Sequence, residues 1–230
     1  MNTLKESLLS KTQIKVSTAA ETIDIEMIKD KLINSGWYQF LCKRDADPDT
    51  YLNIYKKSGK WVVDVDCGMN CYGTPDGHVT DGSFRFGTIN GEYNIVSEPT
   101  KREKSHICEL KYGPIRVERS FNIFDNDKLK NLKDCPKYVL DGILINDTNI
   151  TTLKYFPIYC AGSVYITNNK QLKTVADTKF ANSEGPVVVI KDNGFVSTEL
   201  TKRELKWNIK SYGRYGFRFD KSIAAPEFNK

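Results

Sequence analysis

The chain contains no run of 18 consecutive apolar residues, so its sequence does not encode a membrane-spanning helix. The first 22 residues contain no apolar stretch of signal-peptide length, and we therefore expect a cytoplasmic protein. Histidine is scarce, with two residues among 230. This scarcity limits the number of imidazole-based catalytic or metal sites that the chain can build.

Several nucleotide-binding and catalytic signatures are also missing. The sequence has no Gly-x-x-x-x-Gly-Lys-Ser/Thr motif and no Gly-x-Gly-x-x-Gly motif, which excludes a P-loop and gives no support to a dinucleotide-binding turn. It has no Gly-x-Ser-x-Gly motif, so a serine-hydrolase triad has little support. We expect a protein that is not an enzyme and that needs no cofactor.

What the chain does have is a globular composition, with 40% apolar and 27% charged residues. An α+β unit is predicted over residues 1–75. Apolar residues at helical spacing predict a helix over 21–36, and strands are predicted over 37–41, 51–55 and 61–65. Ser58-Gly59 is typical of a hairpin turn between the last two strands.

From residue 76 to residue 197 the sequence repeats itself. Pro114, Pro136 and Pro157 are 22 and 21 residues apart, and each opens a similar block. Every block contains a short strand, a polar Asn/Asp turn and a pair of apolar residues. The alternate strand residues that we expect to point inward are Phe121, Ile123, Ile143, Ile145, Val164 and Ile166.

Stacking of such blocks buries the apolar face that one block cannot bury alone, which predicts a solenoid with a parallel sheet on one side. Partial copies at 82–86 and 186–193 bring the total to about five rungs of 21–24 residues, with an insertion around 99–105. The fold class is therefore α+β and β-rich. A series of unrelated β-hairpins with coincidental prolines is the alternative.

The repeat resembles a leucine-rich-repeat-like family found in large tailed bacteriophages. The resemblance rests on Leu129-x-x-Leu132, Cys135-Pro136, Val139 and Gly142, and it covers about residues 76–195. The next copy keeps Leu153 and Pro157 but has phenylalanine in place of cysteine. The resemblance implies a protein-interaction scaffold, a phage accessory protein that binds a host protein or complex in the host cytoplasm. It transfers no catalytic residue.

The whole charge excess of +5 lies in residues 201–230, within a C-terminal unit of residues 198–230 where cations and aromatics alternate. The candidate binding residues are Lys202, Arg203, Lys206, Trp207, Lys210, Tyr212, Arg214, Tyr215 and Arg218. We favour a strand that caps the solenoid with solvated cations. The alternatives are binding of nucleic acid, through phosphates and stacked bases, and binding of an acidic protein.

Two weaker patterns point to metals. Cys67 and Cys71, with His78, His106 and Cys108, form a set of zinc-ligand types, although the spacing is irregular. Pro75-Asp76 followed by Glu109-x-Lys111 resembles the signature of a Mg²⁺-dependent nuclease. In a reducing cytosol we expect the six cysteines to be thiols, buried small hydrophobes or metal ligands.

The functional prediction is a non-enzymatic protein-interaction scaffold with a protein partner. Nucleic-acid binding is the alternative, and a metal-dependent nuclease or a virion component comes third. No membrane partner is expected, and the sequence indicates no oligomeric state.

Overall fold

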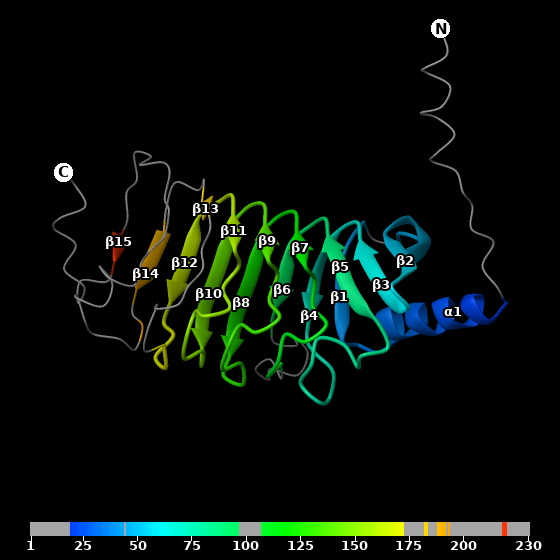
Figure 1. Ribbon diagram of the computed structural model, residues 1–230, viewed down its shortest axis with the longest axis horizontal. Helices are drawn as coiled ribbons and strands as arrows, with labels where there is room; N and C mark the ends of the chain where they lie inside the picture. Colours follow the sequence, from blue (N-terminus) through cyan, green and yellow to red (C-terminus); the bar gives the residue numbers. More distant parts are fainter. Residues whose placement is uncertain are drawn as a thin grey trace, which may run out of the picture.

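Two stacks of strands form the walls of a β-solenoid of about four turns (Figure 1). The structure is a computed structural model that describes residues 19–43, 45–96, 107–172, 182–183, 188–191, 193 and 218–219. None of the helices in these segments is long and apolar enough to cross a bilayer. The chain passes from one stack to the other within each turn, so that neighbouring strands in a stack belong to successive turns.

The first stack, sheet A, has the strand order β1-β4-β6-β8-β10-β12-β14-β15. Its strands are parallel, except that β1 pairs with β4 in the antiparallel direction. Their bounds are β1 Tyr38–Leu41, β4 Gly68–Cys71, β6 Tyr93–Ile95, β8 Phe121–Asn126, β10 Ile143–Thr148, β12 Val164–Thr167, β14 Val188–Lys191 and β15 Arg218–Phe219.

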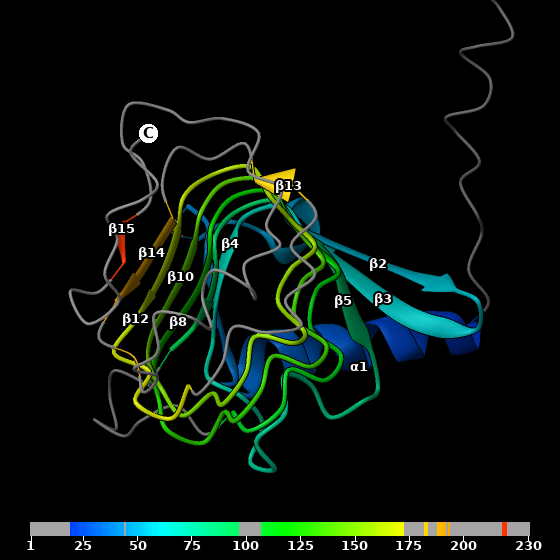
Figure 2. The ribbon, with the colours of Figure 1, turned by 60° about the vertical axis from the view of Figure 1, so that its left-hand side comes forward.

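Sheet B faces sheet A across the core, in the order β13-β11-β9-β7-β5-β3-β2 (Figure 2). It is parallel apart from the β2–β3 hairpin. Its strands are β2 Leu52–Lys57, β3 Lys60–Val65, β5 Arg85–Ile89, β7 Arg116–Val117, β9 Tyr138–Val139, β11 Tyr159–Cys160 and β13 Asn182–Ser183. The sequence predicted a parallel sheet on one side of the solenoid and did not predict this second sheet, because four of its strands have just two residues.

The register of sheet A follows the predicted repeat. Phe121 pairs with Ile143, Ile143 with Val164, and Val164 with Val188, which are 22, 21 and 24 residues apart. All six residues predicted to point inward are buried. The upstream copy was misplaced, however, because Phe84-Arg85-Phe86 leads into β5 of sheet B. The strand that continues sheet A before β8 is β6, where Tyr93 pairs with Phe121.

The predicted polar turns place a left-handed residue at the end of three strands of sheet A, β8, β10 and β12. Asp125, Asp147 and Asn168 have φ values of 47°, 52° and 57°, a region that short polar side chains tolerate. The next residue in each turn points inward and satisfies buried backbone. Asn169, for example, donates from Nδ2 to the carbonyl of Ile145 at 3.1 Å. The interior of each turn is therefore closed by hydrogen bonds.

The solenoid is confirmed in its coarse form, with about four turns in place of the five rungs expected. Leucine-rich repeats carry a helix or a 3₁₀ segment opposite their sheet, whereas these coils carry a second sheet. The relation to that family therefore stays a proposal.

Helix α1 (Ala19–Asn34) packs at the N-terminal end of the solenoid (Figure 1). Ile28 and Leu32 are buried in the same hydrophobic cluster as the strands, and Lys31 Nζ lies 2.7 Å from Asp81 Oδ2. A short 3₁₀ helix, η2 (Pro48–Thr50), precedes β2. The division at residues 75 and 197 stays a prediction, although both sheets run across the first position through the β3–β5 and β4–β6 pairs.

Candidate functional site

Most of the predicted C-terminal binding segment lies outside the described residues. This holds for Lys202, Arg203, Lys206, Trp207, Lys210, Tyr212, Arg214 and Tyr215. Arg218 lies in β15, whose backbone pairs in parallel with β14 at the end of sheet A. The binding role of the segment stays a prediction.

The cysteines differ from the expectation that all six are thiols or metal ligands. Cys42 and Cys67 form a disulfide with a Cα–Cα distance of 5.6 Å, which takes Cys67 away from the predicted pairing with Cys71. Burial raises the pKa of the Cys71 thiol to about 12, so this thiol is a poor ligand and nucleophile at neutral pH. His106 lies outside the described residues. Among the residues that are described, no group of three or more His, Cys, Asp or Glu side chains could hold a metal ion.

The nuclease-like residues are partly brought together. The turn after Pro75 lies beside Glu109, because His78 and Glu109 form an isolated parallel bridge and the backbone N–H of Glu109 donates to the carbonyl of Gly77 at 3.2 Å. Within this arrangement Glu109 Oε2 faces His78 Nε2 at 3.6 Å. Lys111 lines a different feature, a groove on sheet B. The catalytic set that the motif requires is therefore divided between two places.

This groove lies on the outer side of sheet B and has a volume of about 790 Å³. One wall is the start of β3 at the tip of the β2–β3 hairpin, which projects beyond the coils in Figure 2. The other walls are the segments 82–85, 111–115 and 134–137, which lead into β5, β7 and β9. Three successive turns of the solenoid thus contribute to one groove.

Positive charge dominates the groove. Lys60, Arg85, Lys111 and Lys137 line it together with a single acidic residue, Asp134. None of the four cations forms an ion pair with another described residue. Four cations against one carboxylate give the groove a net positive charge that attracts anions, and the field is strengthened in a concave site.

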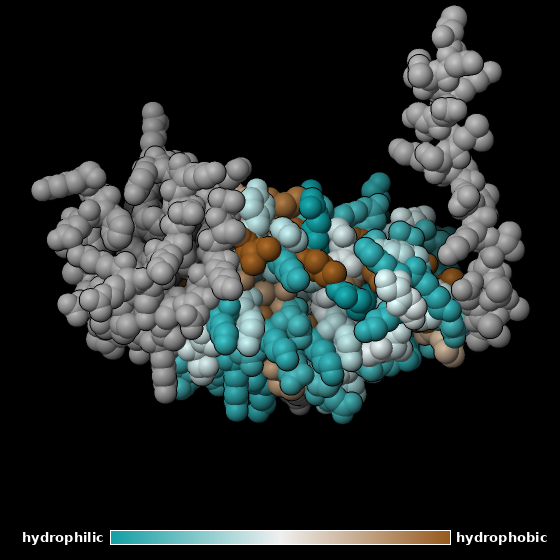
Figure 3. Space-filling model, viewed as in Figure 1, coloured by the Kyte–Doolittle hydropathy of each residue, from teal (hydrophilic) through white to brown (hydrophobic). Residues whose placement is uncertain are grey.

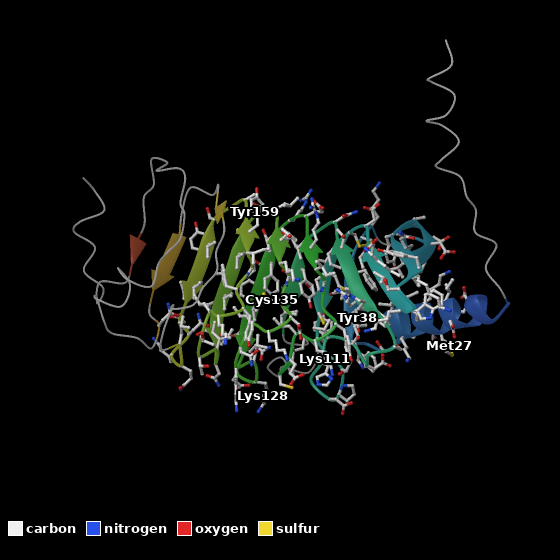
Figure 4. All side chains as sticks on the ribbon, in the orientation of Figure 1. Met27, Tyr38, Lys111, Lys128, Cys135 and Tyr159 are labelled. Atoms are coloured by element: carbon white, nitrogen blue, oxygen red, sulfur yellow. A yellow bond between two sulfur atoms is a disulfide. The ribbon has the colours of Figure 1, made fainter. Side chains whose placement is uncertain are left out.

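Two aromatic rings stand beside these cations. Trp61 and Tyr112 line the groove, and both are half-buried. Lys111 Nζ lies 5.0 Å from the centre of the Tyr112 ring, and Lys56 Nζ lies 4.5 Å from the centre of the Trp61 ring. In the view of Figure 4, Cys135 marks the centre of this face and Lys111 lies below it.

A second hollow of about 540 Å³ extends the groove along the strands of sheet B and shares Lys60, Arg85 and Ile115 with it. Its floor depends on Gly87, because a Cβ at this position would meet the Asp64 carboxylate, which accepts a hydrogen bond from the N–H of Thr88. Figure 3 shows apolar atoms gathered near the middle of the same face. Ile115 and Tyr138, 39% and 40% exposed, line this part of the surface.

The groove could not be predicted from a local motif, because its four cations belong to different segments of the chain. The spacing of the cations in the sequence does indicate the groove. The intervals between successive cations are 25, 26 and 26 residues, a little more than one coil, for Lys60, Arg85, Lys111 and Lys137. Such spacing brings residues of successive coils to one side of a solenoid.

Three comparisons with known proteins add no family to this description. No protein-family model, no curated protein and no solved structure matches the chain.

Proposed function

We propose that the protein is a non-enzymatic binding protein and that an anionic partner occupies the groove on sheet B. The observation that carries this proposal is the convergence, from successive coils, of four cations that form no ion pair with any other described residue, in one groove of about 790 Å³. Lys60 and Arg85 belong to strands β3 and β5, and Lys111 and Lys137 to the segments that lead into β7 and β9, so the hydrogen-bonded coils position all four and little ordering is needed on binding. The sequence-based expectation of a protein partner and its alternative, nucleic acid, are both compatible with an anionic partner.

A role as a phage accessory protein directed at a host complex remains part of this proposal. Its support is the resemblance of the repeat to leucine-rich-repeat-like proteins of tailed phages. A rigid solenoid face suits such a role because it presents an extended surface without needing a catalytic constellation.

Heparin affinity chromatography tests the proposal with a generic polyanion. The test variant replaces all four groove cations by glutamine: Lys60→Gln, Arg85→Gln, Lys111→Gln and Lys137→Gln. The matched control removes four exposed lysines outside the groove: Lys128→Gln, Lys130→Gln, Lys133→Gln and Lys154→Gln. Both variants lose the same net charge, so only position differs between them.

We expect the groove variant to elute at a much lower salt concentration than the control variant, because clustered cations release several counterions together. Equal elution of the two variants would contradict a binding site in the groove. It would leave the predicted C-terminal segment as the source of any remaining retention.

A further inference from the structure

We infer that the groove binds single-stranded nucleic acid, with phosphates on its cations and a base stacked on Tyr112. This inference rests on the proposed function and specifies the class of partner. Cations interleaved with exposed aromatic faces are the combination that single-strand-binding surfaces use, because every base has a flat π-face and every nucleotide a phosphate.

The backbone of Tyr112 gives the main reason for this choice. Tyr112 has a φ of 66°, a left-handed conformation that is rare for a bulky residue and costs roughly 1–2 kcal/mol in L-residues. Such positions favour glycine, asparagine or aspartate. A tyrosine in this conformation therefore indicates that its side chain serves a purpose other than the stability of the turn.

The equivalent turn in the next coil has a different residue at the left-handed position. The N–H of Gly113 donates to Leu110 O at 3.0 Å, and one coil later the N–H of Cys135 donates to Leu132 O at 3.0 Å. The left-handed residue in that second turn is Asp134, with a φ of 64°. Tyr112 thus stands where the neighbouring coil has a residue well suited to the backbone.

The surroundings of Tyr112 accommodate its ring rather than bury it. Gly82, at a φ of 89°, lies against the ring, and a Cβ there would come within 3.2 Å of Cε2. The ring is held at the groove wall while remaining half-exposed, and Lys111 lies close to it. A planar group stacked on this ring would place its charged substituents among the groove cations.

The carboxylates of an acidic polypeptide can pair with the groove cations, but they provide no flat ring to stack on Tyr112 or Trp61. A duplex offers phosphates, but its bases are stacked on one another. Single-stranded nucleic acid is the anionic polymer that engages both features at once.

Fluorescence anisotropy separates these possibilities with four probes of matched charge. They are a mixed-sequence single strand of about 12 nucleotides, within the site sizes of single-strand-binding domains, the same strand without bases, a duplex and a poly-glutamate peptide. We expect the single strand to bind at least about 10-fold more tightly than the abasic strand, in line with the usual contribution of base stacking.

The decisive variant is Tyr112→Asn, which removes the ring and suits the left-handed backbone. We expect its affinity for the single strand to fall about 5- to 150-fold, the range measured for loss of one stacked base. The dependence of affinity on salt should stay unchanged, because no phosphate contact is lost. The melting temperature should not fall. Tyr155→Asn, at the corresponding turn of a later coil outside the groove, is the control.

Equal affinity for the single strand and the abasic strand, or tighter binding of poly-glutamate or duplex, would overturn the inference and leave the proposed function standing. Failure of every polyanion to bind would overturn both. Single-strand binding that Tyr112→Asn does not weaken, but that Trp207→Ala abolishes, would move the site to the C-terminal segment and likewise overturn the inference.

Discussion

The outer faces of the two sheets differ in how their polar side chains are paired: those of sheet A bond to one another, whereas the groove cations of sheet B form no ion pair with described residues. On sheet A, four neighbouring strands carry an amide ladder formed by Gln39, Asn70, Asn94 and Asn122. Asn122 Nδ2 donates to Asn94 Oδ1 at 2.8 Å, Asn94 Nδ2 to Asn70 Oδ1 at 2.9 Å, and Asn70 Nδ2 to Gln39 Oε1 at 2.9 Å. These amides satisfy one another within the sheet.

On sheet B, the cations of the groove form no ion pairs with described residues, and the aromatic rings beside them remain half-exposed. Polar groups that pair within the protein contribute to stability, whereas charged groups left without partners contribute little to it and are available to a ligand. The sheet A ladder therefore contributes to stability, whereas the sheet B groove is the site that we propose for binding.

The largest effect is expected from a charge introduced into the hydrophobic core between sheet A and sheet B. Ile145→Asp buries a carboxylate at a fully buried position of β10, and we expect the protein to unfold, with a loss of more than about 4 kcal/mol. Leu144→Asp is the matched control, since the preceding residue is half-buried on the outer face. Circular dichroism and thermal melting measure both. A folded Ile145→Asp variant would contradict the register of sheet A.

The disulfide continues the antiparallel pairing of β1 with β4, because Cys42 follows Leu41 and Cys67 precedes Gly68, so it cross-links two neighbouring strands of sheet A at the helix-capped end. Cys42 and Cys67 are 25 residues apart. We expect Cys42→Ser to lower the free energy of unfolding by about 3 kcal/mol, mainly because the unfolded chain gains conformational entropy when the cross-link is removed. Denaturant unfolding measures this loss, and addition of a reductant to the parent protein should reproduce it.

Cys108→Ser is the control, because this exposed thiol is not disulfide-bonded. Titration of six thiols in the native protein would contradict the disulfide. It would agree instead with the reducing compartment that the sequence predicted.

A variant of the amide ladder should change stability and leave polyanion affinity unchanged, the opposite of the effect expected for the groove variants. Asn94→Ala removes one donor and one acceptor from the middle of the ladder, and we expect a loss of about 1–3 kcal/mol of stability because its neighbours lose their partners. Affinity for polyanions should stay unchanged. Asn53→Ala, at an exposed asparagine of β2, should have little effect on either measurement. A change in polyanion affinity without a change in stability would reverse our assignment of the two faces.

Local pattern was sufficient for much of the fold. The alternating residues of Phe121–Asn126 and Ile143–Thr148, the polar turns after them and the Ser58-Gly59 hairpin are read correctly because each depends on neighbours within a few positions. The short strands of sheet B after the hairpin were not predicted, because strands such as Arg116–Val117 and Tyr138–Val139 are too short to show a period.

The sequence by itself determined the repeat, its inward-facing residues and the length of each coil, since these follow from alternation and spacing along the chain. Only the tertiary structure decided which residues meet across coils: the Cys42–Cys67 disulfide, the amide ladder and the groove of Lys60, Arg85, Lys111 and Lys137. The physical reason is that stacking brings together residues about one coil apart in the chain. Their contact depends on the rise and register of the whole solenoid, and no local pattern specifies these.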